Sequence, residues 1–101
     1  MAIEINVQQN EVHVLLEGKI YVEDAAVLRE KLLELLEQGQ SRFVFHLHNL
    51  SYIDSSGLGV LVAIHKKALE RNGKIVVKGL QGAVKELFLL TRLNKVFEIL
   101  D

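Results

Sequence analysis

The chain has 101 residues, half of them hydrophobic, which is enough for one domain (1–101) with a core of its own. Twelve Lys and Arg residues nearly balance thirteen Asp and Glu residues, for a formal net charge of −1, so we expect neither nucleic acid nor a membrane as a partner. The absence of cysteine excludes disulfides, cysteine-ligated metals and thiol catalysis.

The first residues, MAIEIN, have neither the basic flank nor the apolar segment of a signal peptide. The longest apolar run, residues 60–64, is far shorter than the ~20 residues needed to span a bilayer. We therefore expect a soluble, cytoplasmic protein.

Alternating apolar and polar residues predict a hairpin of two strands, over 3–7 and 12–16, with a turn at Gln9-Asn10. Gly18 is predicted to interrupt the second strand, and Glu23-Asp24 then begin a helix. The apolar stripe of this helix comprises Ala25, Leu28, Leu32, Leu35 and Leu36.

The remaining chain alternates between strands and helices. Gly39 ends the first helix, and Asn72-Gly73 end the second. The later elements are a strand over 43–47, a helix over about 57–71, a strand over 75–77, a helix over about 84–90 and a short strand over 96–100.

The predicted order is ββαβαβαβ, and each strand has one apolar and one largely polar face. The polar faces carry Glu4, Asn6, His13, Glu17, His46, His48, Lys74, Lys78 and Glu98. Strands covered on both sides would be continuously hydrophobic, so helices are expected mainly on one face. Right-handed crossovers that step in one direction give this arrangement. We predict a single-domain α/β fold, a mixed five-stranded sheet in sequential order.

The candidate site is the stretch from Leu50 to Val60, which contains Asp54-Ser55-Ser56-Gly57 between a strand and a helix. Loops after parallel strands meet at one edge of a sheet, so Tyr21 and the Gly79–Gly82 loop are expected beside this turn. Three interpretations are open. The residues could simply cap the helix, Ser55 could be a nucleophile, or Ser55 could accept a phosphate at the helix start.

The nucleophile interpretation is disfavoured, because Ile53 and Asp54 precede Ser55 where the G-x-S-x-G elbow needs a glycine two residues before the serine. No histidine has a placement that marks it as the base. Nucleotide binding is also disfavoured, because Val62 occupies the place of the third glycine in the pattern that Gly57 and Gly59 begin. We expect no cofactor and no enzymatic activity.

The stretch from Tyr52 to Leu61 resembles the signature of bacterial anti-sigma factor antagonists, single-domain members of the STAS family. The resemblance extends along the chain, through Gly18-Lys19-Ile20, Asn72-Gly73-Lys74 and the third helix with the turn Thr91-Arg92-Leu93. Members of this family often carry Asp at the position of Tyr21, so this chain departs from the pattern beside the turn.

The resemblance implies a protein that binds an anti-sigma factor serine kinase and thereby frees a sigma factor. In that scheme phosphorylation of Ser55 breaks the complex, and a PP2C-type phosphatase restores it. Asp54 orients the acceptor and Ser56 assists at the helix start. The alternative is a non-catalytic STAS subunit of a larger assembly, such as a stressosome or a lipid-transport ABC complex. A monomer or weak dimer is expected.

Further partner contacts are expected around the turn. The residues assigned to them, besides Asp54 and Ser56, are Tyr21, Gly57, Leu58, Gly59 and Leu89. Of these, Leu58 and Leu89 are interpreted as exposed apolar residues.

His13, His46 and His48 are predicted to share one face of the sheet, as metal ligands can. A polar sheet face that happens to hold imidazoles is the favoured explanation, and we assign no metal site.

Overall fold

Five strands form one sheet in the order β1-β2-β3-β4-β5, as predicted. The computed structural model describes the backbone of residues 2–100 and the side chains of residues 3–100. The strands are β1 (Ala2–Gln8), β2 (Glu11–Ile20), β3 (Arg42–Ile53), β4 (Lys74–Lys78) and β5 (Glu98–Leu100), and the helices are α1 (Val22–Glu37), α2 (Ser55–Glu70), α3 (Gly82–Leu90) and the 3-10 turn η1 (Leu93–Lys95).

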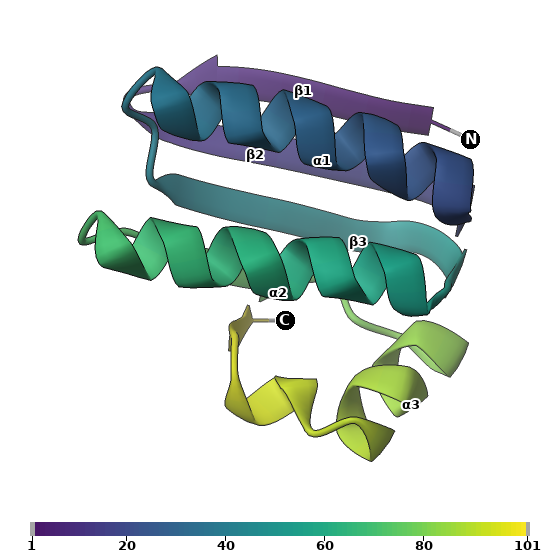
Figure 1. Cartoon of the computed structure of the whole chain (residues 1–101). Coiled ribbons are helices and arrows are strands. Elements are labelled where there is room, and N and C mark those ends of the chain that lie inside the picture. Colours follow the sequence, from purple (N-terminus) through teal and green to yellow (C-terminus); the bar gives the residue numbers. More distant parts are fainter. Residues whose placement is uncertain (1, 101) are drawn as a thin grey trace.

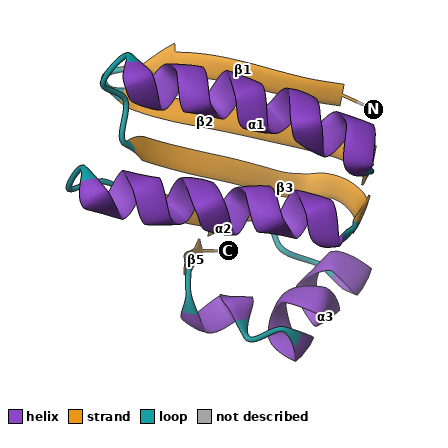
Figure 2. Cartoon of the chain, in the orientation of Figure 1, coloured by secondary structure: helices purple, strands orange, loops and turns teal. Residues whose placement is uncertain are grey.

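Helices α1 and α2 lie side by side over one face of the sheet (Figure 1). Colouring by element shows the helices grouped on one side of the strands, with α3 near the end of β3 (Figure 2). The predicted architecture, with helices mainly on one face, is confirmed. No helix among residues 2–100 is both long and apolar enough to cross a membrane.

The sheet is mixed, because β1 pairs with β2 in antiparallel orientation and the other neighbours are parallel. Gln9 and Asn10 make the hairpin turn, both with positive φ. The core lies between the sheet and the helices. Its largest fully buried side chains are Phe43, Phe45, Phe88, Leu16, Ile20, Leu28, Leu32, Leu47, Ile53, Leu61, Ile64 and Ile75.

The two central strands run further than predicted. β2 continues through Gly18, which has a φ of 76°, to Ile20, and the pairing with β3 shifts register between Gly18 and Lys19. Because a bulge of this kind bends a strand without ending it, the prediction that Gly18 interrupts β2 is wrong. β3 likewise continues to Ile53, so both strands reach the candidate turn.

The last predicted strand is shorter than expected. Val96 and Phe97 lie outside β5, after the 3-10 turn η1. Phe97 is buried, its ring centre 6.0 Å from that of Phe88 and 5.0 Å from that of His65. The apolar pattern of this segment therefore comes partly from core packing between elements.

Candidate functional site

The turn between β3 and α2 is capped by Asp54. Its backbone is extended, and its carboxylate Oδ1 accepts a hydrogen bond from the Gly57 N–H at 3.1 Å. The helix begins at Ser55, two residues before the predicted start. Because Asp54 supplies the cap, the capping interpretation applies to this residue, and Ser55 occupies the first helical position with its side chain exposed.

The turn is fixed to the end of β2 by two hydrogen bonds. The Asp54 N–H donates to the Ile20 carbonyl at 3.2 Å, and the Ser51 hydroxyl donates to the Gly18 carbonyl at 2.9 Å. The helix start thus has a defined position relative to both central strands.

Gly57 lets the helix approach these strands. A Cβ at this position would lie 2.5 and 2.8 Å from two carbons of the Ile53 side chain and 3.2 Å from Ile20 Cγ2. Real Cβ contacts essentially never fall below 3.0 Å, and Ile53 is buried, so only glycine fits without rearrangement. The glycine three residues after Asp54 is therefore required by packing against Ile53, apart from any role of the serines.

Tyr21 lies beside the turn, as predicted. Its ring centre is 5.4 Å from that of Tyr52, and both side chains are nearly half exposed, at 46% and 43%. The Tyr21 N–H donates to the Asp24 carboxylate at 3.0 Å, which holds the start of α1 in place. The two tyrosines form an exposed aromatic pair next to Ser55's turn.

An apolar groove of about 220 Å³ adjoins Tyr52, between the end of β3 and α3. It is lined by Ser51, Tyr52, Ile53, Ala83, Val84, Glu86, Leu87 and Leu90. Leu90 is 82% exposed. This groove could not be predicted from the sequence, because it forms where α3 packs against β3, far away in the chain. The one local indication was a second leucine, Leu90, directly after Leu89.

The other predicted contact residues divide into exposed and buried. Gly59 and Leu89 are exposed, Leu89 by 50%, and Ser56 is partly buried. Leu58 is only 8% exposed and belongs to the hydrophobic core, so the expectation of an exposed side chain is wrong there. α2 packs against the sheet and against α1, and a helix with two neighbours buries a wider arc.

The Gly79–Gly82 loop lies further from the turn than predicted. Its Gln81 side chain donates to the His48 carbonyl, and Gly79 packs against the His48 ring. Because β3 continues for five residues beyond His48, this loop contacts the middle of the strand. It is α3, the helix after the loop, that lines the groove beside the turn.

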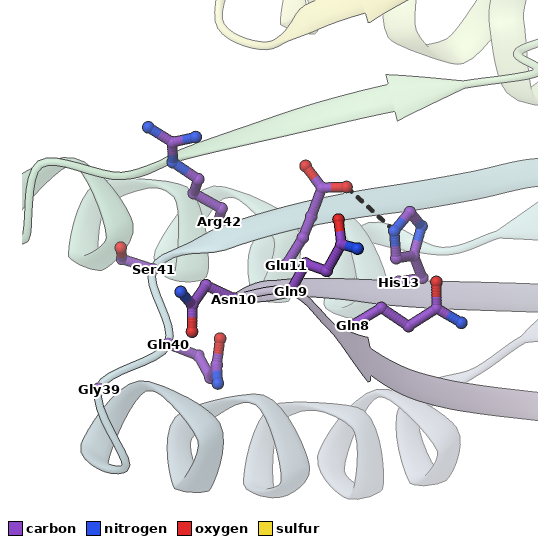
Figure 3. A pocket seen from close by; sticks show the side chains of 9 residues that line it. All are labelled: Gln8, Gln9, Asn10, Glu11, His13, Gly39, Gln40, Ser41 and Arg42. Atoms are coloured by element: carbon purple, nitrogen blue, oxygen red, sulfur yellow. Dashed lines mark ion pairs between the residues drawn. The ribbon is translucent and has the colours of Figure 1, made fainter.

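A larger, polar groove of about 460 Å³ lies at the opposite end of the parallel strands, where β2 and β3 begin (Figure 3). It is lined by Gln8, Gln9, Asn10, Glu11, His13, Gly39, Gln40, Ser41 and Arg42. None of the candidate site residues lies in it, so it forms no part of the turn.

The three histidines share one face of the sheet, as predicted. His13 Nδ1 and His46 Nε2 are 2.9 Å apart, and the His46 and His48 rings are stacked with centres 6.2 Å apart. Partial burial lowers the pKa of His46 below its usual value, and His13, Lys78 and His48 lower it further. Across residues 2–100, no group of three or more His, Cys, Asp or Glu side chains is placed to hold a metal ion.

The fold and the turn define a small α/β domain with a serine at the exposed start of its second helix. Comparison with protein families matches residues 2–101 to the STAS domain. The chain therefore belongs to the STAS domain family.

Individual relatives agree with this assignment. The chain is 39% identical over 101 residues to the anti-sigma-B factor antagonist of Bacillus subtilis (strain 168), covering 98% of this chain and 92% of the relative. Its fold matches the anti-sigma factor antagonist SpoIIAA in unphosphorylated form, with a TM-score of 0.84, 19% identity and coverage of 99% and 88%. It also matches Bacillus SpoIIAA in phosphorylated form, with a TM-score of 0.82, 19% identity and coverage of 99% and 92%.

Proposed function

We propose that this protein is an anti-sigma factor antagonist. Its unphosphorylated form binds an anti-sigma factor that is also a serine kinase, which frees a sigma factor; phosphorylation of Ser55 breaks the complex, and a PP2C-type phosphatase restores it. The observation that carries the proposal is the exposed Ser55 side chain at the first position of α2, in a chain 39% identical to an anti-sigma-B factor antagonist.

The position of Ser55 suits a reversible phosphate. A phosphoserine adds about −1.5 to −2 charges and three acceptor oxygens. At a helix N-terminus this charge faces unpaired N–H groups and the positive end of the helix dipole, which stabilise anions. The domain should therefore keep its fold when it is phosphorylated, and the effect falls on the bound partner.

The partner surface we propose is centred on Ser55 and includes Tyr21, Ser56 and Gly59. Leu89 lines a separate groove with Leu80 and Ile99, and we propose it as an additional contact outside this surface. A second negative charge beside the Asp54 carboxylate would repel an acidic partner surface and would be costly to desolvate in a close contact. Each ~1.4 kcal/mol of this cost weakens binding tenfold.

Asp54, Gly57 and Leu58 support this surface from within the turn. Asp54 caps the helix and holds the acceptor serine beside a carboxylate. Gly57 permits the close approach to Ile53, and Leu58 anchors the first turn in the core. Substitutions of these three residues should act through the position of Ser55 as well as through direct contact.

Phosphate transfer is the direct test. The protein is incubated with an anti-sigma factor kinase from the same genome and ATP, and the mass of the intact chain is measured. One phosphate should be added to the wild type and to Ser56→Ala, and none to Ser55→Ala. Uptake by Ser55→Ala equal to that of the wild type would refute the assignment. Binding of the kinase by Ser55→Asp should be weaker than binding by Ser55→Ala.

In this scheme the protein binds one enzyme, the kinase, and is the substrate of the kinase and the phosphatase. It has no catalytic role of its own.

A kinase partner uses ATP, so we place the activity in the cytoplasm. The alternative role, as a subunit of a stressosome or of a lipid-transport ABC complex, is less favoured, because the Bacillus subtilis relative and SpoIIAA are both anti-sigma factor antagonists. Co-purification with a permease or a large particle would support that alternative.

A further inference from the structure

Two histidines link the central strands on the sheet face that lies away from α1 and α2. His13 belongs to β2 and His46 to β3, and both are partly buried. His13 Nδ1 and His46 Nε2 are 2.9 Å apart, whereas the ring centres are 5.2 Å apart. The two nitrogens therefore lie between the rings and face each other, which is the geometry of a hydrogen bond with one shared proton.

This geometry leaves no room for a metal ion between the two nitrogens. Zinc, for example, lies about 2.0–2.1 Å from each imidazole nitrogen in a tetrahedral site, so two nitrogens that bind the same ion would be about 3.3–3.4 Å apart. The separation of 2.9 Å is typical of a hydrogen bond. The pair is therefore a proton-sharing pair.

Glu11 sets which nitrogen carries a proton. Its Oε1 lies 3.0 Å from His13 Nε2, as the dashed line in Figure 3 shows. A carboxylate only accepts hydrogen bonds, so His13 Nε2 carries a hydrogen, and Nδ1 of the neutral ring is the acceptor for His46 Nε2–H.

The pair can accept one additional proton but not two. If His13 becomes charged, Glu11 compensates the charge, and His46 can accept the hydrogen bond at Nε2 in its other tautomer. If both rings are charged, each facing nitrogen carries a hydrogen and neither can accept. The hydrogen bond is then lost, and two like charges face each other across the strands.

The charged groups around His46 come from three strands. β2 contributes Glu11 and His13, β3 contributes the stacked His48, and β4 contributes Lys78, which is opposite His46 in the register. Further along β4, Lys74 pairs with Glu98 of β5 at 3.3 Å. Glu11 contacts His13, and the cation beside His46 is Lys78. From β1, on the other side of β2, Asn6 lies opposite His13, and Asn6 donates a hydrogen bond to the Glu4 carboxylate.

We propose that the His13–His46 pair is an acid-sensitive link between β2 and β3. It stabilises the sheet while the pair carries at most one additional proton, and it breaks when both rings are charged. These two strands also carry Tyr21 and the Ser55 turn at their far ends.

The sign of the pH effect follows from the lowered pKa of His46 in the folded protein, caused first by partial burial and then by His13, Lys78 and His48. In the unfolded chain this histidine titrates near its ordinary value of about 6.5. The unfolded chain thus binds more protons below that value. The stabilisation is complete above about pH 6.5 and is lost as the pH falls through the folded pKa of His46.

The first experiment measures individual histidine titrations by NMR of the ring resonances, on the wild type and two variants. His46 should titrate below its ordinary value in the wild type. In His13→Gln its midpoint should rise, because a facing titratable group is removed, and His48→Gln should raise it less. A midpoint at or above the ordinary value in the wild type, or one unchanged in His13→Gln, would overturn the proposal.

The second experiment compares thermal unfolding at about pH 7.5 and about pH 5, on either side of the ordinary histidine pKa. The Tm of the wild type should be lower at about pH 5 than at about pH 7.5. This decrease in Tm should be smaller for His46→Gln. Burial also lowers the pKa of His65, but this residue is present in both proteins, so its effect cancels in the comparison. Equal losses of Tm would contradict the proposal. If His46→Gln fails to fold, the NMR titrations still decide.

Discussion

Two glycines of α2, two residues apart, should respond to alanine substitution in opposite directions. Gly57 and Gly59 both lie in the first turns of the helix, and neither has a positive φ. A Cβ at Gly57 would lie 2.5 and 2.8 Å from the Ile53 side chain, whereas a Cβ at Gly59 would have no neighbour within 4 Å. Comparing the two alanine variants therefore separates the effect of helix propensity from the effect of packing.

The magnitudes can be worked out for each site. Alanine is favoured over glycine inside a helix by up to about 1 kcal/mol, so Gly59→Ala should be more stable than the wild type by up to that amount. At Gly57 the same gain is opposed by overpacking, which costs about 1–3 kcal/mol in a well-packed core. Because Ile53 is buried and has little room to move, we expect Gly57→Ala to be about 1 kcal/mol or more less stable.

Urea unfolding followed by circular dichroism measures both effects as changes in the free energy of unfolding. The midpoint should move to lower urea for Gly57→Ala and to higher urea for Gly59→Ala, at an unchanged slope. For a domain of this size a loss of 1 kcal/mol corresponds to a fall in Tm of about 4–8 °C. If Gly57→Ala were as stable as the wild type, the close packing at Ile53 would not be what requires glycine there.

Three further substitutions test other parts of the structure. Asp54→Ala removes the N-cap of α2 and should cost about 0.5–2 kcal/mol in urea unfolding, whereas Asp54→Asn, which can still accept the hydrogen bond, should lose less. Phe88→Ala removes a fully buried ring of α3 and should cost about 3–5 kcal/mol, measured in the same way; a loss under 1 kcal/mol would show that α3 contributes little to the core. Lys74→Ala breaks an exposed ion pair with Glu98 and should change stability by less than about 1 kcal/mol, an effect that added salt should reduce further.

The order of elements could be predicted because the patterns are local. Alternation along residues 3–7, 12–16 and 43–47 has the period of a half-buried strand, and the polar face indicated that helices would cover one side. The ends of β2 and β3 could not be predicted in the same way. Register shifts near Leu15 and Gly18 break the alternation, and such bulges depend on the partner strand.

At the candidate turn, too, the features set by local sequence could be predicted, whereas those set by packing could not. The residue types of Asp54 and Ser55 predicted a helix start, and the structure places them there. Which residue caps the helix, and why glycine follows at position 57, depends on the Ile20 and Ile53 side chains packed below. Leu58 was wrongly expected at the surface for the same reason, because its burial depends on what α2 packs against.

The turn separates residues that hold the helix in place from the serine that we propose as the phosphate acceptor. Asp54 makes the side-chain hydrogen bond of the cap, Gly57 allows the helix to contact the strands, and Ser51 ties β3 to β2. Ser55 lies at the surface between them. A group placed on its hydroxyl therefore changes the charge of the surface without removing a contact that holds the helix. Substitutions of Asp54 and Gly57 should lower stability, whereas substitution of Ser55 should leave stability within about 0.5 kcal/mol and change partner binding alone.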